Sequence, residues 1–288
     1  MHTKHIVSTA LTAVLLAAPA LFAAPIPEDA KINGIAIGLQ SYSFNRFSVM
    51  EAIEKTALAG GKVIEFYPGQ KLSKEQPDVK WDHNASDEVI AQVKEKLAKH
   101  AVKAVNYGVV SVPADEAGAR KLLEFAKKLG LYAITTESVD ALPTLSKLVA
   151  EYDVKVGVHN HPKQPNNPNY KVWDPAYVLS VTKDLDPRIG AACDTGHWLR
   201  SGLNPVDCLK TLQGRVVSSH LKDLNKIGPG AEDVPYGAGV ANIPAILNEL
   251  KRQGFQGNIS IEYESLWENN VPAAAQCIGF VRGYTTGR

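Results

Sequence analysis

The sequence predicts an α/β protein folded as a single (β/α)₈ TIM barrel over residues 25–288. Three observations carry this prediction. Eight short segments rich in β-branched residues recur along the chain, stretches of helical periodicity lie between them, and glycine or Asp-Pro turns mark the junctions. A barrel of this kind takes about 250 residues. Of the 288 residues, 45% are hydrophobic, which is ample for one large core.

The predicted strands are short apolar runs, and each of the later ones ends in polar residues. They lie at 34–44, 62–67, 103–110, 132–139, 155–161, 189–198, 216–222 and 258–264. The first strand runs into Gln-Ser-Tyr-Ser-Phe-Asn at 40–45, with no glycine-rich phosphate turn. A doubly wound sheet that binds a dinucleotide normally carries such a turn at this point, so the barrel is the better prediction.

The predicted helices repeat apolar residues three or four positions apart. Val49, Ile53 and Ala57 share one helical face, and Leu122, Phe125 and Leu129 share another. The helical stretches lie at 49–57, 89–97, 122–129, 142–149, 177–183, 205–212, 243–250 and after residue 267. Strands alternating with helices in this way are typical of parallel sheets built from βαβ units.

Residues 1–24 are predicted to be a cleaved signal peptide that is not part of the fold. A polar, basic start at 2–5 precedes an apolar run at 6–18, and small residues at Ala23 and Ala24 offer the cleavage site. The apolar run is short for a membrane-spanning helix, and a retained N-terminal anchor is the alternative. We therefore expect the protein to be periplasmic or secreted.

Charge and cysteine content exclude several classes of function. The net charge is +1 and no basic stripe is visible, which argues against a nucleic-acid partner. The three cysteines, Cys193, Cys208 and Cys277, are widely spaced and form neither a disulfide framework nor a CxxC metal motif. We expect a small sugar or glycoside as the partner, with no nucleic acid and no membrane after signal cleavage. The sequence leaves homo-oligomer formation open.

Four of the later predicted strands end in an ionisable side chain. These residues are Glu137, Asp194, His220 and Glu262. In a barrel the carboxyl ends of the strands meet at the face that carries the active site. Carboxylates gathered there would repel one another and would be costly to desolvate unless a cation neutralised them. We therefore predict that the four residues bind one divalent metal ion. The oxygen-rich donors suit Mn²⁺ best, and Mg²⁺, Co²⁺ and Zn²⁺ are alternatives.

Each of these residues also has a structural interpretation when it is taken alone. Asp194, for instance, fits a helix cap, and His220 fits a hydrogen-bonded core histidine. Their position at the ends of four strands favours a joint site. On the last strand Glu264 faces the same side as Glu262 and is the alternative ligand.

Other polar and aromatic residues are candidates for substrate contact. His159 and His161 face the same side of the fifth strand and fit either substrate binding with acid–base work or structural hydrogen bonds. Glu65 on the second strand fits contact with substrate or the orientation of a neighbour. Trp198 fits a pocket wall that stacks on a sugar, although aromatic filling of the barrel is the alternative.

Taken together, these motifs resemble the xylose-isomerase-like barrels, also called the sugar phosphate isomerase/epimerase family. The motifs are Glu137, the Asp-Thr-Gly-His turn at 194–197, His-Leu-Lys-Asp at 220–223, the glycine-rich 235–239 and Ile-Glu-Tyr-Glu at 261–264. The resemblance extends over nearly the whole mature chain. It implies a barrel with one metal ion bound by Glu137, Asp194, His220 and Glu262.

The resemblance also implies roles in the reaction. Glu137 and Glu262 would exchange the substrate proton, and His197 would hydrogen-bond a substrate oxygen. The arginine that ketose epimerases of the family carry after the strand-seven histidine is not evident, and Lys222 or Lys226 lies in that region. We expect Lys222 to bind the substrate, but this departure means that the exact substrate does not transfer.

From these features we expect a divalent-metal-dependent sugar isomerase or epimerase that abstracts a proton next to a carbonyl on a sugar or keto-sugar. One alternative is a 3-keto-glycoside lyase, which would use the same metal site for β-elimination. An alternative of another class is a non-catalytic periplasmic carbohydrate-binding barrel. Apurinic endonucleases of the same superfamily need extra histidines on the early strands, and these are not present.

Overall fold

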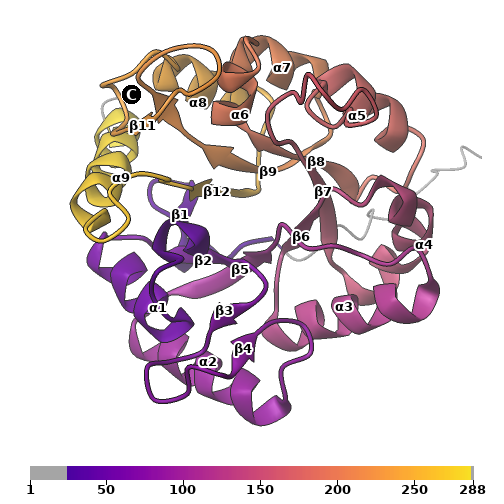
Figure 1. The fold of residues 1–288 in the computed structure, drawn as a ribbon, viewed down its shortest axis with the longest axis vertical. Helices are drawn as coiled ribbons and strands as arrows, with labels where there is room; N and C mark the ends of the chain where they lie inside the picture. Colours follow the sequence, from indigo (N-terminus) through magenta and orange to yellow (C-terminus); the bar gives the residue numbers. More distant parts are fainter. Residues whose placement is uncertain (1–24, 287–288) are drawn as a thin grey trace, which may run out of the picture.

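The computed structural model describes residues 25–286, and these form a closed barrel of eight parallel strands surrounded by helices (Figure 1). The strands are hydrogen-bonded in the order β1-β12-β9-β8-β7-β6-β5-β2, which confirms the predicted fold. Their bounds are β1 Ala36–Gln40, β2 Val63–Phe66, β5 Lys103–Tyr107, β6 Ala133–Thr136, β7 Lys155–His159, β8 Ile189–Asp194, β9 Val216–Leu221 and β12 Asn258–Ile261. The predicted signal peptide, residues 1–24, lies outside the described residues.

The helices pack around the outside of the strand ring (Figure 1). They are α1 Val49–Leu58, α2 Asp87–Lys99, α3 Glu116–Leu129, α4 Leu142–Tyr152, α5 Pro175–Thr182, α6 Thr195–Arg200, α7 Pro205–Thr211, α8 Ile243–Arg252 and α9 Val271–Thr286. Their apolar faces account for their positions, since Leu122, Phe125 and Ala126 of α3 are all buried. No helix within residues 25–286 is long and apolar enough to cross a bilayer.

The sixth predicted strand, 189–198, is shorter in the structure, because its second half is helical. The Asp194 carboxylate accepts a hydrogen bond of 2.7 Å from the backbone N–H of His197 and so caps α6. A cap of this kind satisfies a backbone donor that the first helical turn leaves without a partner. Asp194 therefore ends the strand and begins the helix, which brings its second carboxylate oxygen to the barrel mouth.

Short secondary-structure elements lie in several of the loops that follow the barrel strands. One hairpin pairs β3 (Gln70–Lys71) with β4 (Lys80–Trp81), and another pairs β10 (Asp223–Leu224) with β11 (Asp233–Val234). Within residues 25–286, 3₁₀ turns also follow β1 at Ser41–Phe44 and β6 at Val139–Ala141, and another precedes β1 at Glu28–Ala30.

Asp223 fixes the glycine-rich loop that follows the second hairpin. Its carboxylate accepts the backbone N–H groups of Gly237, Gly239 and Ala241 at 2.9–3.0 Å. A Cβ on Gly239 would lie 2.3 Å from the Asp223 carboxylate, so only glycine allows this approach. The aspartate of the His-Leu-Lys-Asp segment is therefore a structural residue.

The two ends of the barrel interior differ in character. At the amino ends of the strands, Ile26 is 2% exposed and packs in a small cluster with Ala36, Val63 and Val217, which closes that end. Toward the carboxyl ends the interior is polar, and Glu65 and other side chains there are fully buried. The chemistry of this chain therefore lies at the carboxyl ends of the strands, as in other barrels of this kind.

Candidate metal centre

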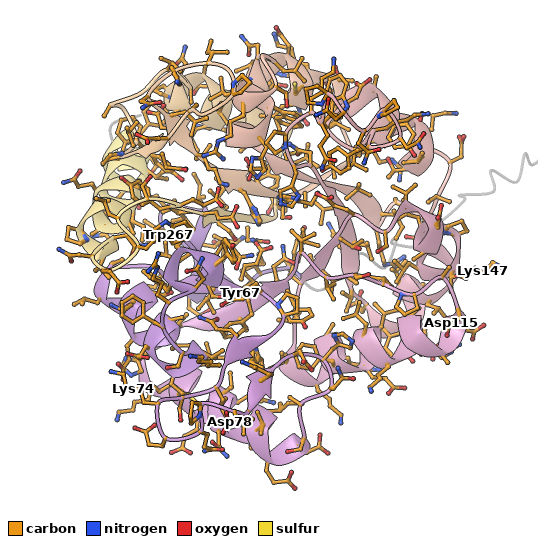
Figure 2. The ribbon with its side chains drawn as sticks, viewed as in Figure 1. Tyr67, Lys74, Asp78, Asp115, Lys147 and Trp267 are labelled. Atoms are coloured by element: carbon orange, nitrogen blue, oxygen red, sulfur yellow. The ribbon has the colours of Figure 1, made fainter. Side chains whose placement is uncertain are left out.

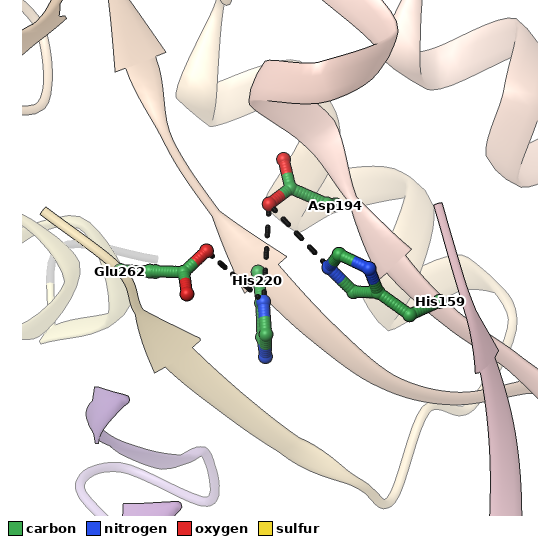
Figure 3. A group of neighbouring side chains, drawn as sticks. All are labelled: His159, Asp194, His220 and Glu262. Carbon is green, nitrogen blue, oxygen red and sulfur yellow. Dashed lines mark ion pairs between the residues drawn. The ribbon is translucent and has the colours of Figure 1, made fainter. Parts of the chain in front are cut away.

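Four buried side chains converge at the carboxyl ends of neighbouring strands (Figure 3). They are His159, Asp194, His220 and Glu262, and one ligand atom from each lies within 4.8 Å of the others. Asp194 and His220 are register partners on β8 and β9. Asp194 Oδ2 is 3.8 Å from both His159 Nε2 and His220 Nδ1, and Glu262 Oε2 is 3.3 Å from His220 Nδ1.

Three of these atoms have no hydrogen-bond partner although they are buried. They are His159 Nε2, Asp194 Oδ2 and His220 Nδ1. Asp194 Oδ2 has the Lys222 ammonium as an ion-pair partner at 3.1 Å, whereas the two imidazole nitrogens make no hydrogen bond. Buried polar atoms nearly always have a partner, so two such nitrogens that face one carboxylate oxygen need an explanation. A divalent cation supplies one, since imidazole nitrogens and carboxylate oxygens are its usual protein ligands. The residues present therefore fit a metal ion.

The far nitrogen of each imidazole is held by a second carboxylate. Glu65 Oε1 lies 3.0 Å from His220 Nε2, and Glu137 Oε1 lies 2.9 Å from His159 Nδ1. An ionised carboxylate only accepts hydrogen bonds, so each histidine donates a proton outward, and its other nitrogen faces the cluster, where it offers a lone pair once the ring is neutral. Metal-binding histidines are commonly oriented by carboxylates in this way.

The electrostatics of the cluster also favour a cation. Burial alone would lower the pKa of His220, but Glu65 and Glu262 outweigh it and raise this pKa well above its usual value. Burial would raise the pKa of Glu262, yet Lys222 and His220 hold it well below its usual range. Carboxylates that stay ionised around an imidazole are neutralised by a proton or by a metal ion at its free nitrogen.

The structure brings together three of the four predicted ligands, and the fourth place in the cluster is taken by His159 in place of Glu137. His159 is the last residue of β7, is 1% exposed and points into the barrel. Glu137 follows the end of β6, and its carboxylate contacts His159 Nδ1, the ring nitrogen that faces away from Asp194. The two nitrogens of His159 face Glu137 and Asp194, which fits a metal ligand, and contact of His159 with substrate stays a prediction.

Glu137 instead joins the two histidines of the fifth predicted strand. Besides His159, its Oε1 contacts His161 Nδ1 at 2.6 Å, and the Tyr170 hydroxyl lies 3.1 Å from both carboxylate oxygens. Burial would raise the pKa of Glu137, but the hydrogen bonds from His159 and His161 outweigh it and lower the pKa to about 2. With its Nδ1 proton donated to Glu137, His161 keeps Nε2 free on the side of the pocket.

Lys222 is a buried cation among carboxylates. It is 1% exposed, and its Nζ lies 2.7 Å from Glu262 Oε2, 2.7 Å from Glu264 Oε2 and 3.1 Å from Asp194 Oδ2. Burial would lower its pKa, but these three carboxylates raise it well above the usual value. The sequence predicts that Lys222 binds the substrate. In the structure its ammonium group contacts Asp194, Glu262 and Glu264.

Gly196 makes room for this lysine. A Cβ at position 196 would lie 2.7 Å from Lys222 Cβ and 2.7 Å from Lys222 Cδ. Contacts this short would displace the lysine stem or the start of α6. The glycine of the Asp-Thr-Gly-His turn is therefore explained by the packing of Lys222.

Arg200 provides a guanidinium group that the sequence analysis missed. It comes from α6, one turn after His197, and its Nη1 lies 3.2 Å from His197 Nδ1 and 3.3 Å from Glu264 Oε2. Its Nη2 lies 2.8 Å from Asp233 Oδ2. The sequence feature that could have revealed Arg200 is its position three residues after His197, because this spacing places both side chains on one helical face.

A pocket of about 300 Å³ opens beside the cluster. His161, His197, Glu262 and Glu264 line it on the metal side, and Tyr42 is among the residues that line the rest. Burial lowers the pKa of His197 well below its usual value, so its ring is neutral. With Nδ1 next to Arg200, the neutral His197 ring carries its proton on Nε2, which lies 3.6 Å from Asp194 Oδ2 at the edge of the cluster. The contact of His197 with a substrate oxygen stays a prediction.

Two residues expected at the substrate lie elsewhere. Glu65 is fully buried below the cluster, where it holds His220 and accepts a 2.6 Å hydrogen bond from Ser260 Oγ. Trp198 is 1% exposed and belongs to the hydrophobic core. Successive helix residues differ in direction by about 100°, so His197 faces the pocket while Trp198 packs into the core.

Comparisons with known proteins agree with this fold. Residues 45–282 match the family model described as xylose isomerase-like TIM barrel. A solved structure from Parabacteroides distasonis ATCC 8503, of uncharacterised function, is 29% identical, with a TM-score of 0.68 over 87% of this chain and 99% of that one. A curated, uncharacterised protein of Methanocaldococcus jannaschii is 28% identical over 137 residues, which are 46% of this chain and 45% of the relative. The match thus spans about half the length of that relative.

Two further solved structures share the fold at lower identity. A D-tagatose 3-epimerase-like protein is 20% identical, with a TM-score of 0.65 over 87% of this chain and 97% of that one. A D-allulose 3-epimerase from Methylomonas sp. is 14% identical, with a TM-score of 0.68 over 87% of this chain and 98% of that one. At these identities the likeness concerns the fold alone.

Proposed function

Because this chain belongs to the xylose isomerase-like TIM barrel family, we propose that it is a divalent-metal-dependent enzyme that removes a proton next to a carbonyl on a sugar or keto-sugar. The reaction type is that of a sugar isomerase or epimerase. The observation that carries the proposal is the meeting of His159, Asp194, His220 and Glu262 beside a pocket, with an imidazole nitrogen of each histidine buried there without a hydrogen bond. Structural neighbours with epimerase in their names support it.

The proposed metal ion would act as a Lewis acid toward a carbonyl oxygen and a neighbouring hydroxyl oxygen of the substrate. Mn²⁺ remains our first choice, with Mg²⁺, Co²⁺ and Zn²⁺ as alternatives. The structure places two imidazole nitrogens in the donor set, where the sequence predicted one. A softer donor set raises the expected preference for Zn²⁺ and Co²⁺ and lowers that for Mg²⁺.

Two groups of the chain are placed to move protons. Glu262 lines the pocket and is ionised, so one of its carboxylate oxygens can accept a proton from carbon. His161 presents Nε2 to the same pocket and is held at Nδ1 by Glu137. We propose that Glu137, which the resemblance made a direct proton carrier, acts through the His161 ring. His197 would donate a hydrogen bond to a substrate oxygen.

Solvent-deuterium exchange tests this function. Protein stripped with a chelator and reloaded with Mn²⁺ is incubated in D₂O with a panel of ketoses and 3-keto-glycosides, and loss of C–H signal is followed by NMR. We expect exchange only with metal present, and strongly reduced exchange in Glu262→Gln. Metal-independent exchange, or full exchange in that variant, would overturn the proposal.

The same experiment separates the alternatives. Isomerisation or epimerisation gives a new sugar with its carbon skeleton intact. A 3-keto-glycoside lyase shares the first proton transfer but also releases the aglycone by β-elimination. A non-catalytic carbohydrate-binding barrel would bind the sugar without metal and would show no exchange with any substrate.

A further inference from the structure

Three aromatic side chains lie together at the barrel mouth, on the side away from the metal ligands His159 and Asp194. Tyr42 follows β1, Tyr67 follows β2 and Trp267 follows β12. The Tyr42 ring is 5.2 Å from that of Tyr67 at 82° and 6.1 Å from that of Trp267 at 89°. The three strands are neighbours in the ring, so their loops meet at one place; Tyr67 and Trp267 are labelled in Figure 2. We call these three residues the aromatic wall.

The aromatic wall does not belong to the hydrophobic core. Tyr42 is 39% exposed, and the other two rings are partly exposed. Two aromatic residues close to them in sequence, Phe44 and Phe66, are fully buried and do pack in the core. Phe44 and Phe66 therefore provide the aromatic core packing near β1 and β2. The three rings of the aromatic wall are not needed there, and their exposed faces can contact a ligand. Exposed aromatic rings grouped at a pocket are typical of binding sites.

The wall is continuous with the pocket of the metal centre. Tyr42 and Tyr67 line the same pocket as Glu262 and Glu264. At about 300 Å³ this pocket is at the lower end of the range for ligand sites, roughly 300–1,000 Å³. A ligand with one sugar ring at the metal centre would fill this pocket, and the aromatic wall is the apolar surface beside it onto which a further ring could extend.

The charges around the pocket select against anions. Two carboxylates line it, and no lysine or arginine is among the described residues that do. The nearby cations Lys222 and Arg200 are already paired with Glu264 and other carboxylates. Apart from the proposed metal ion, which would hold the reacting sugar ring, a sugar phosphate would meet negative charge and no unpaired lysine or arginine among the described pocket residues. Tyr67 adds a neutral hydrogen-bonding group, since burial raises its pKa to about 12.

We infer that the substrate is an uncharged keto-glycoside of two parts, with one sugar ring at the metal centre and the aglycone or second ring stacked on the aromatic wall. This inference rests on the proposed function and specifies its substrate class. Rings pack face to edge or offset on aromatic side chains, and such contacts add to the gain from burying apolar surface.

Calorimetry with matched glycosides tests the inference. Methyl β-D-glucopyranoside, phenyl β-D-glucopyranoside and glucose 6-phosphate are titrated into the Mn²⁺-loaded protein. We expect the phenyl glycoside to bind at least about fivefold more tightly than the methyl glycoside, and the phosphate to bind most weakly. Trp267→Ala and Tyr42→Ala should bring the Kd values of the two glycosides to within about twofold of each other. Trp267 is not among the residues that line the pocket, so the Kd of the methyl glycoside should stay unchanged in Trp267→Ala.

Matched variants keep the test specific. Tyr42→Phe retains the ring and should keep the preference for the phenyl glycoside. Leu266→Ala alters an exposed neighbour of Trp267 that is 64% exposed and should also keep it. Equal binding of both glycosides by the unaltered protein, no detectable binding of either, or a preference for the phosphate would overturn the inference.

The test is independent of the test of the proposed function. Preference for the phenyl glycoside without deuterium exchange on any substrate would leave the aromatic subsite standing and reject the proposed reaction. Metal-dependent exchange on ketoses, with equal binding of both glycosides, would support the reaction and reject the subsite.

Discussion

Glu65 Oε1 lies 3.0 Å from His220 Nε2 and joins β2 to β9 through the interior of the barrel. Because the outer nitrogen of the ring is held in this way, His220 Nδ1 is the only nitrogen left to face the cluster. Glu137 does the same for His159 on β7. In two carboxylate–imidazole pairs the inner nitrogen of the ring therefore faces Asp194, and that of His220 also faces Glu262.

The metal content of single variants should separate ligands from the carboxylates behind them. His220→Ala and Asp194→Asn remove a ligand atom and should reduce bound metal from one ion per chain to nearly none, measured by elemental analysis after gel filtration. Glu137→Gln should still bind one ion when metal is in excess, with an affinity about 10- to 100-fold lower. Full metal content in both ligand variants would contradict the site, and complete loss in Glu137→Gln would return Glu137 to the ligand set.

Glu65 should act on the metal through His220. Glu65→Gln removes the charge that fixes the Nε2 proton, so we expect metal affinity to fall by about 10- to 100-fold in competition with a chelator. Ser260→Ala removes only one of the hydrogen bonds that Glu65 accepts and is the matched control, with a smaller loss. Equal losses in the two variants would mean that general packing, and not the Glu65 charge, supports the site.

Lys222 should stabilise the metal-free protein more than the loaded one. Lys222→Met leaves Asp194, Glu262 and Glu264 without their buried cation, and loss of one partner of a buried pair costs about 3–5 kcal/mol. Denaturant unfolding should show this loss in the metal-free variant, and saturating metal should restore part of it. The exposed pair of Arg120 and Glu151 is the control, since Arg120→Met should cost at most about 1 kcal/mol.

Gly196 should tolerate no side chain. Gly196→Ala places a methyl group 2.7 Å from the Lys222 stem, and overpacking of this kind costs about 1–3 kcal/mol of unfolding free energy. Gly279→Ala in α9 is the matched control. No heavy atom lies within 4 Å of the added methyl there, so we expect a gain of up to about 1 kcal/mol from helix propensity. Equal stability of the two variants, measured by thermal unfolding, would contradict the packing described for Lys222.

Export of the protein is a prediction from residues 1–24. Expression of the full chain in a bacterium should give a periplasmic product that begins near Pro25, and intact-mass measurement reads out the cleavage site. Cleavage there would keep Ile26, which is 2% exposed and closes the amino end of the barrel. A full-length product in the membrane fraction would favour the retained anchor instead.

Local sequence patterns were sufficient to predict the fold. Helical periodicity such as that of Leu122 and Phe125 marks a buried helix face wherever it occurs, and all eight predicted strands appear in the closed barrel. The pattern did not separate the end of β8 from the start of α6, because Asp194 serves both elements. An element boundary of this kind depends on a side-chain cap, which hydrophobic spacing does not encode.

The sequence by itself determined that Asp194, His220 and Glu262 would meet, because each follows a parallel strand and the ends of parallel strands in a barrel share one face. Only the tertiary structure decided that His159 completes the cluster, that Glu137 and Glu65 stand behind the imidazoles, and that Trp198 lies in the core. Position along a strand gives the side of the sheet a residue faces. The depth its atoms reach and the partner they meet depend on how neighbouring strands and helices pack in three dimensions.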